Sequence, residues 1–250
     1  MFNFCKPKGP KVTWWSDIKN LEKICPPVPA KQFIPEWFKK IKASEYGDRS
    51  NIKLCPSFMQ YFSMGWVMPL WCDLQMGIDS VGNVFWESPH AKFRFEFHRE
   101  YQYKNHLPQK EQDQLACVIK PVSPWHVKIS KGWSLLQLPM TYYFNDDWYV
   151  LTGILPASIW HETNQQIIIK KNFFKGIEST NEKHDSGNIK RIIPKGTPLA
   201  QYIPIPDDYT GEVVEETEEL KELEDTAHLM IGQTFVKSYH KMIKCPYVKK

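Results

Sequence analysis

The stretch that decides the fold reads Trp125-His126-Val127-Lys128-Ile129-Ser130-Lys131-Gly132-Trp133-Ser134-Leu135-Leu136-Gln137-Leu138. Apolar and polar residues alternate through its first five positions, which is the period of a half-buried β-strand. Gly132 then marks a turn before a second run at residues 133–138. The segment from Ile129 to Pro206 is therefore expected to form consecutive antiparallel strands of one barrel or sandwich.

Strand patterns extend over residues 58–205. Lys92 to His98 alternates charged and aromatic residues, and Leu115 to Ile119 is a short apolar run. Val81-Gly82-Asn83-Val84 has the residues of a hairpin turn. The other predicted strands are Trp148–Leu155, Gln165–Ile169 and Leu199–Ile205. Short strands separated by turns indicate a mainly β fold, of the β-clip or jelly-roll-like barrel kind.

The composition agrees with a folded β domain. The chain has 250 residues, of which 42% are hydrophobic and 14% aromatic, and it contains 19 prolines. A chain of this length buries roughly three quarters of its unfolded surface, so it forms a core without covalent staples. No apolar run reaches the ~18 residues that a membrane-spanning helix needs. We expect no membrane partner.

The spacing of the six cysteines indicates in which cellular compartment the protein is located. They form no Cys-x-x-Cys pair, so zinc is not indicated. The chain begins at Met1 without an apolar signal segment. We therefore expect a soluble, intracellular protein with reduced thiols, located in a cytoplasm-like compartment.

Residues 1–50 are predicted to be an irregular N-terminal arm. Three prolines within residues 26–29 require extended backbone, and Pro35 is suited to start a short helix that contains Trp37 and Phe38. The candidate interface residues of this arm are Trp14, Trp15, Phe33, Trp37 and Phe38. So much aromatic surface is typical of an assembly element, and an arm that wraps its own domain fits the pattern equally well.

Residues 207–250 are predicted to be a C-terminal helical tail that follows the β domain at residues 51–206. Its helix, from Gly211 to Lys244, is acidic in the first half and basic in the second, which suits the helix dipole. Leu220, Leu223 and Phe235 lie on its apolar stripe. The tail is either a solvated surface helix or a contact between subunits.

Residue types that carry chemistry do not form a recognisable set. His90, His98 and His106 recur every eight residues, a spacing longer than a usual strand. Ser134 and Ser158 lack a Gly-x-Ser-x-Gly elbow. We expect ordinary surface or core histidines, and neither a metal nor a cofactor.

Two charged pairs have simple explanations. Asp146 and Asp147 are adjacent, so on a strand they point to opposite faces, and a polar hairpin tip is the better interpretation. The basic pairs Lys39-Lys40 and Lys249-Lys250 are too small to indicate nucleic-acid binding, and we interpret them as parts of a solvated surface.

The segment from Gly132 to Pro206 resembles the trimeric dUTPase family and its β-clip relatives. Gly196-Thr197-Pro198-Leu199-Ala200-Gln201 is similar to the family's Gly-x-Arg-x-Ala-Gln motif. The run from Gly132 to Pro139 resembles its glycine turn that leads to Pro-Arg-Ser, and Gly153-Ile154-Leu155 takes the place of its Gly-Val-Ile-Asp segment. The matching positions are Gly132, Pro139, Gly153, Gly196, Ala200 and Gln201.

The resemblance implies a β-clip fold and a trimer. It also indicates at which positions of this chain the family's catalytic and phosphate-binding residues are replaced. Pro156 stands where that family has the Asp that activates water. Met140-Thr141 replaces its phosphate-binding Arg-Ser pair, and Pro198 replaces the Arg of the later motif. Proline and methionine side chains neither activate water nor bind phosphate, so the resemblance implies a catalytically dead relative.

A second resemblance covers nearly the whole chain. It rests on Ile34-Pro35-Glu36-Trp37-Phe38-Lys39, Pro124-Trp125-His126-Val127-Lys128 and Lys131-Gly132-Trp133-Ser134. These strings resemble an uncharacterised protein family of tailed phages, especially cyanophages. The resemblance implies a phage gene product located in the virion, and in the host cytoplasm during assembly.

Three hypotheses follow from the sequence. The first is a non-catalytic virion structural or assembly protein that forms a homo-oligomer, a trimer before a dimer, and contacts other virion proteins. The second is a divergent dUTPase-like nucleotide hydrolase with relocated catalytic groups. The third is a jelly-roll metal oxygenase, which needs a His and carboxylate cluster in a pocket.

Overall fold

The computed structural model describes residues 9–42, 52–78, 83–156, 161–175, 189–211, 213, 215–218 and 221–222. The chain divides into two compact units, of which the first is formed by residues 1–33 and 65–208 and the second by residues 34–64 and 209–250. The domain boundaries expected at residues 50 and 206 stay a prediction. The Val81-Gly82 turn and most of the predicted C-terminal helix, including Leu220, Leu223 and Phe235, lie outside the described residues.

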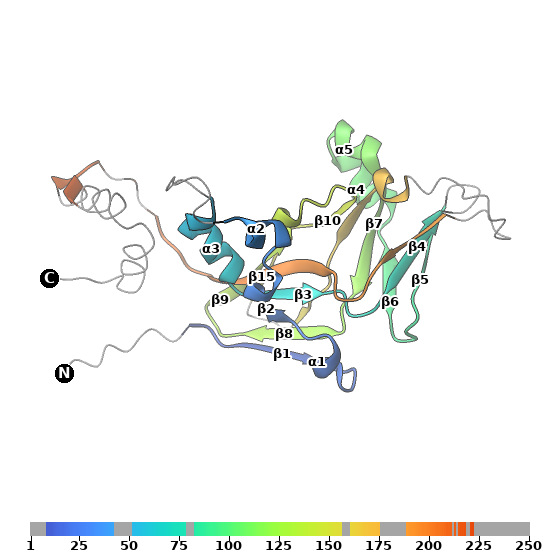
Figure 1. Cartoon of the computed structure of the whole chain (residues 1–250), viewed down its shortest axis with the longest axis horizontal. Coiled ribbons are helices and arrows are strands. Elements are labelled where there is room, and N and C mark those ends of the chain that lie inside the picture. Colours follow the sequence, from blue (N-terminus) through green and yellow to red (C-terminus); the bar gives the residue numbers. More distant parts are fainter. Residues whose placement is uncertain are drawn as a thin grey trace. The chain divides into compact units, whose positions relative to one another are not determined.

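The described residues of the first unit form four antiparallel sheets; Figure 1 labels many of their strands. Two sheets have three strands each, in the order of their hydrogen-bonded neighbours: β1 (Val12–Ser16), β8 (Trp125–Ile129) and β12 (His161–Glu162) in one, and β14 (Ile189–Ile193), β4 (Leu74–Ile78) and β5 (Val84–Glu87) in the other. A four-stranded sheet has the order β10 (Trp148–Val150), β13 (Ile167–Lys170), β7 (Leu115–Val122) and β6 (Arg94–Phe97). A five-stranded sheet has the order β11 (Gly153–Pro156), β9 (Trp133–Pro139), β15 (Pro198–Pro206), β3 (Trp66–Pro69) and β2 (Val28–Pro29). The mainly β prediction is confirmed. None of these sheets, as far as the structure describes them, closes on itself.

Helices are short. They are α1 (Leu21–Ile24), α2 (Glu36–Lys40), α3 (Pro56–Ser63), α4 (Glu100–Tyr103) and α5 (Gln109–Gln114), with 3-10 turns η1 (Ala30–Phe33), η2 (Ile52–Leu54), η3 (Lys104–His106), η4 (Thr141–Tyr143) and η5 (Lys171–Phe174). No helix within the described ranges is long and apolar enough to cross a membrane.

Alternation in the sequence translates directly into burial. Trp125, Val127 and Ile129 of β8 are buried, while the residues between them are partly or fully exposed. β1 alternates in the same way, and it pairs along its whole length with β8. The expectation of an irregular arm is therefore wrong for residues 12–16, because the short period-2 pattern of this strand finds its partner more than a hundred residues away.

Three other predictions change. Residues 148–155 form two strands in different sheets, because β10 pairs with β13 and β11 pairs with β9. The strands between Ile129 and Pro206 accordingly do not form one continuous set. Helices α3, α4 and α5 occupy stretches that the sequence analysis assigned to strands. Pro56 opens α3 at the helical position where its missing N–H costs nothing.

Apolar packing holds the first unit together. One core cluster joins residues of all four sheets, among them Leu74, Ile119, Trp125, Leu135 and Ile193. A second cluster lies where Val118 and Ile168 point away from that core toward Tyr103 and Leu107. Strands β7 and β13 are thus covered on both faces. This explains why Ile167-Ile168-Ile169 is a continuous apolar run without alternation.

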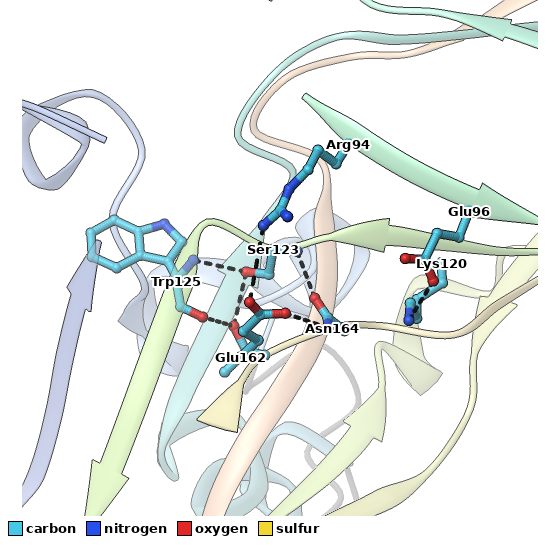
Figure 2. A network of polar contacts seen from close by, with 8 residues as sticks. Arg94, Glu96, Lys120, Ser123, Trp125, Glu162 and Asn164 are labelled. Atoms are coloured by element: carbon cyan, nitrogen blue, oxygen red, sulfur yellow. Dashed lines mark hydrogen bonds and ion pairs between the residues drawn. The ribbon is translucent and has the colours of Figure 1, made fainter. Parts of the chain in front are cut away.

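A polar network crosses this apolar core. Figure 2 shows its outer part, around Ser123, Trp125 and Asn164. The Ser123 backbone N–H donates to Asn164 Oδ1 at 2.9 Å, and Ser123 Oγ lies 2.9 Å from Thr163 Oγ1. Ser123 Oγ also accepts from the Trp125 N–H, and the Thr163 hydroxyl donates to the Trp125 carbonyl. Outside it, Glu162 accepts from the Asn164 amide and lies 4.0 Å from Arg94. These bonds fix the β7–β8 turn against residues 162–164.

The inner part of the network is centred on Tyr202, whose side chain is fully buried. The Gln165 amide donates to the Thr163 carbonyl and, at 2.8 Å, to the Tyr202 hydroxyl. That hydroxyl donates to Gln137 Oε1 at 2.7 Å, and the Gln137 amide donates to the Leu151 carbonyl. Burial raises the pKa of Tyr202 well above its usual range, so the hydroxyl stays protonated in the folded chain.

A glycine lets two strands approach beside Tyr202. Gly65 has φ +69°, and a Cβ at this position would lie 1.9 Å from the Tyr202 carbonyl oxygen. Its own carbonyl accepts from the Ala30 N–H at 3.1 Å. Only glycine combines this left-handed backbone with so close a contact.

The second unit has a small aromatic core of its own. Phe38 of α2 is buried, with ring centroids 4.7 Å from Phe62 and 6.4 Å from Phe58 of α3. The Lys53 ammonium donates to the Lys39 and Ile41 carbonyls at the end of α2. The ammonium thus satisfies carbonyls that the helix leaves unpaired.

We predict that Tyr202→Phe destabilises the folded chain by ~1–3 kcal/mol, because Gln137 Oε1 loses its donor inside the core. Denaturant unfolding followed by tryptophan fluorescence measures the change. Tyr101→Phe is the matched control, since Tyr101 is 60% exposed, and a change within ~0.5 kcal/mol is expected there. Equal stability of both variants would contradict the role of the network.

The Tyr202 variant also has a pH signature. The folded-state pKa of Tyr202 lies above its unfolded value, so the unfolded chain releases the phenolic proton first. The contribution of this group is full below about pH 10 and declines as the pH rises beyond it. We expect the stability difference between wild type and Tyr202→Phe to shrink on that alkaline side, measured in the same unfolding experiment.

Candidate functional site

The positions that resemble dUTPase motifs converge on one sheet. Strands β11, β9 and β15 are direct neighbours, with Gly153 opposite Gln137 and Ala200 opposite Pro139. Gln201 pairs with Leu138 and is buried, as is Ala200. The structure therefore brings together segments that lie about sixty residues apart in the sequence.

Two glycines of this set mark the entries to strands. Gly132 precedes β9 with φ +81°, and its carbonyl accepts from the Asp207 N–H at 2.9 Å. Gly196 precedes β15 with φ +85°, and its N–H donates to the Leu70 carbonyl at 2.7 Å. Both lie in the left-handed region that glycine favours, so these turns position the strand ends that follow.

A pocket of about 620 Å³ opens at the end of this sheet. The end of β9 and the residues after it line one wall, and the start of β15 lines another. The third wall is the segment from Tyr143 to Val150. The complete lining is Pro139, Met140, Thr141, Tyr143, Phe144, Asn145, Asp146, Trp148, Tyr149, Val150, Thr197, Pro198 and Leu199.

Aromatic and aliphatic groups dominate this pocket. Phe144 is 67% exposed and holds a left-handed backbone at φ 49°, which is uncommon for a residue with a bulky side chain. The turn is supported by Asn145, whose Oδ1 accepts from the Asp147 N–H at 2.9 Å. Tyr143 is anchored as well, since its hydroxyl donates to the Phe33 carbonyl at 2.9 Å.

Polar groups of the pocket are few and are used locally. The Thr197 hydroxyl donates to the Pro194 carbonyl at 2.6 Å, and the Thr141 hydroxyl donates to the Pro139 carbonyl. Asp146 is the one carboxylate among the described residues of the lining. The pocket can enclose an apolar or aromatic group, and the described part of its walls holds no histidine, lysine, arginine or cysteine.

The replaced dUTPase positions divide between two places. Met140, Thr141 and Pro198 lie together in the pocket. Pro156 lies at the opposite end of β11, where it pairs with Ser134. Met140 and Pro198, the two positions that the resemblance matches to arginines, therefore lie together, apart from the position that it matches to the catalytic carboxylate.

A second depression of about 370 Å³ shares Asp146 with this pocket. Lys170, Lys171 and Lys175 line it together with Asp113, Gln114 and Asn172. The signal for it in the sequence is Lys170-Lys171 directly after the apolar run 167–169, with Lys175 close behind, and this signal was missed. Asp147 points elsewhere, to Arg191 at 3.2 Å. The acidic pair is therefore part of the loop before β10 rather than a hairpin tip.

Three of the described histidines contact aromatic rings. His90 lies 4.7 Å from Trp71, His98 lies 5.1 Å from Tyr103, and His126 stacks on Trp15 at 5.5 Å. His98-Arg99-Glu100 is a His-x-Glu tripeptide of the type that oxygenases use. Its Glu100 forms an ion pair with Lys104 at 3.0 Å. Across the described ranges, no three His, Cys, Asp or Glu side chains gather at one point.

The predicted interface residues have different environments. Trp14 packs on Trp66 and Tyr202, at ring distances of 6.3 and 5.6 Å, and Phe38 is buried in the second unit. Trp15 and Trp37 are 38% and 36% exposed. Part of the aromatic surface of the N-terminal region is thus used inside its own chain, and Trp15 keeps an accessible face.

Comparisons with known proteins give likenesses to solved structures only. No model of a known protein family matches the chain, and no curated protein sequence matches it. The solved structure of a point mutant of the dUTPase from phage phi11 of S. aureus, with its structural Mg(II) ion, is similar over 50% of this chain and 99% of that one. The identity is 19% and the TM-score is 0.25.

Two thiols of the first unit are predicted to be unreactive. Burial raises the pKa of Cys117 to about 12, and burial also raises the pKa of Cys25, whose thiol donates to the Leu70 carbonyl at 3.5 Å. Because the thiolate is the reactive form, alkylation of native Cys117 at pH 8 should be roughly a thousandfold slower than that of an ordinary thiol.

Iodoacetamide labelling followed by peptide mass spectrometry measures this rate. Cys55 and Cys117 are both partly exposed, so Cys55 serves as the internal reference matched in exposure, and the denatured chain gives the unprotected rate at every site. Labelling of Cys117 as fast as Cys55 in the native protein would contradict the raised pKa of the Cys117 thiol.

Proposed function

We propose that the chain is a non-catalytic structural or assembly subunit of a tailed-phage particle. It acts through contacts with copies of itself and with other virion proteins, in the virion and in the host cytoplasm during assembly. The phage context is supported by the resemblance to the cyanophage-type family in residues 34–39 and 124–134.

One observation carries the non-catalytic part of this proposal. The pocket at the dUTPase-like positions contains Met140 and Pro198 where phosphate-binding arginines are needed, and Asp146 is the one ionisable group in its described lining other than the phenols of Tyr143 and Tyr149. General acid–base catalysis needs a group with a tuned pKa that reaches the reacting atom, and phosphate binding needs cations or backbone N–H groups. An aromatic and aliphatic pocket instead suits the apolar part of a partner.

The proposal includes a finer fold and assembly state. Strands β9, β11 and β15 are arranged as part of a β-clip, and copies associate as a homo-oligomer, for which the dUTPase resemblance favours a trimer. Phe144, which is 67% exposed beside the pocket, and Trp15, which is 38% exposed on β1, are the apolar groups that such contacts cover.

The direct test is quantitative proteomics of purified particles from a phage that encodes the chain. A structural subunit is present at a fixed number of copies per particle that survives extensive washing and density-gradient purification. A chain found only in the lysate, at no fixed ratio to the capsid proteins, contradicts the virion role.

A divergent nucleotide hydrolase is the second candidate. The lysine-lined depression favours it, because Lys170, Lys171 and Lys175 lie beside a pocket that accommodates a ring, with Asp146 shared between the two. In such an enzyme the lysines would hold phosphates and Asp146 would activate water.

We predict that the purified protein with Mg²⁺ does not hydrolyse dUTP or dCTP above the rate of a protein-free control, because Pro156, Met140 and Pro198 supply no catalytic group. Pyrophosphate release measures the activity. Asp146→Asn is the matched control for contamination. Turnover that is present in the wild type and lost in Asp146→Asn would establish the second candidate and overturn the first.

A further inference from the structure

The outer edge of β1 has no strand partner in the part of the chain that the structure describes. β1 pairs with β8, which in turn pairs with β12, and no described strand pairs with the other side of β1 (Figure 1). An open edge presents a row of backbone N–H and C=O groups that another strand can pair with. Proteins usually cover or shorten such edges, so an uncovered one that carries an exposed tryptophan is a candidate contact surface.

The register defines which backbone groups point outward. The Ser130 N–H donates to the Lys11 carbonyl at 3.1 Å, so the backbone of Lys11 faces β8. Hydrogen-bonding direction alternates along an antiparallel strand, so Thr13 and Trp15 also face β8. The N–H and C=O groups of Val12, Trp14 and Ser16 consequently face the open side.

The side chains of this strand alternate between the core face and the exposed face of the sheet. Val12, Trp14 and Ser16 are partly buried against the core, whereas Lys11, Thr13, Trp15 and Asp17 are exposed. The exposed face therefore reads, in order, a cation, a threonine, a tryptophan and an anion. A strand that pairs with this edge meets these four side chains on one face of the extended sheet.

We propose that β1 pairs with β1 of a second copy of this chain, antiparallel and centred on Trp14. In that register, residue n of one copy faces residue 28 − n of the second copy. Val12 faces Ser16 of the second copy and Trp14 faces its equivalent, so all the outward N–H and C=O groups of residues 12, 14 and 16 are satisfied. On the exposed face, Thr13 faces Trp15 and Lys11 faces Asp17 of the second copy.

Charge identifies the occupant as a copy of the same strand. The register that pairs all outward backbone groups also places both lysines opposite aspartates, once at each end of the two-fold contact. Aromatic residues opposite β-branched ones, and opposite charges facing each other, stabilise an antiparallel pair. The same patch serves both copies, as in an isologous contact. The two three-stranded sheets become one continuous sheet.

This inference deepens the proposed subunit role, on which it rests, by naming one contact surface. A two-fold strand pair closes at two copies, and it is therefore a different contact from the three-fold one that the dUTPase resemblance implies. A particle protein that has both contacts links its trimers into larger assemblies.

Disulfide trapping tests the register. Facing residues of a non-hydrogen-bonded pair, such as Thr13 and Trp15 of the second copy, have the short Cα separation that a disulfide requires. Thr13→Cys and Trp15→Cys are purified separately, mixed and oxidised, and the linked peptides are identified by mass spectrometry, which excludes the native cysteines. We expect the 13–15 link in the mixture, and no 13–13 or 15–15 link in the separate variants.

Charge exchange tests the contact without changing the strand core. Lys11→Asp or Asp17→Lys alone places like charges opposite each other at both ends, and should weaken the dimer roughly tenfold. The double variant Lys11→Asp/Asp17→Lys should restore the wild-type dissociation constant, measured by analytical ultracentrifugation. Circular dichroism checks that each variant is folded.

The outcomes separate the contact from the proposed function. The 13–15 link together with rescue by the double variant supports the strand pair. An oligomer without the link, or one that ignores the charge exchange, overturns this contact while self-assembly stands. A monomer at every concentration overturns it too, and particle proteomics still decides the virion role separately.

Discussion

Tyr202 is the point at which three sheets are tied together. Its hydroxyl joins Gln137 of β9 to Gln165, and Gln165 leads through Thr163 to the β7–β8 turn. A buried polar chain of this kind stabilises only when every member is bonded, so it admits one arrangement of the strands around it. The pocket end of β9 and β15 depends on that arrangement, and so does the position of β8. Because β1 has no other strand partner among the described residues, the contact edge depends on it as well.

How much of this follows from the sequence depends on how local the signal is. The alternation in residues 125–129 and the run at 133–138 predict β8 and β9, because a period of two needs only neighbouring residues. The end of β10 and the start of β11 were not predictable, since Leu151 leaves the strand to bond Gln166 and Gln137, which are remote in sequence. The same holds for β1, whose partner lies more than a hundred residues away. Residues 100–114 were misassigned because tertiary packing on β7 and β13 outweighs their weak local pattern.

The candidate site was only partly visible in the sequence. The motif resemblance located Met140, Pro198 and Gly196, which the structure places at or beside one pocket. It did not indicate Phe144, Trp148 or the lysines after β13, because a pocket wall is built from segments whose proximity only the fold determines. In the described lining, Met140 and Pro198 stand at the positions that the motif resemblance matches to arginines.

The central claim is that this chain acts through contacts, with the outer edge of β1 as the first of them. Residue-resolved amide hydrogen exchange at low and high protein concentration tests it most directly. The account predicts that the N–H groups of Val12, Trp14 and Ser16 exchange rapidly in dilute protein and become protected on concentration, while those of Thr13 and Trp15 are protected throughout. Equal protection of both sets at every concentration, or concentration-dependent protection confined to other segments, would contradict it.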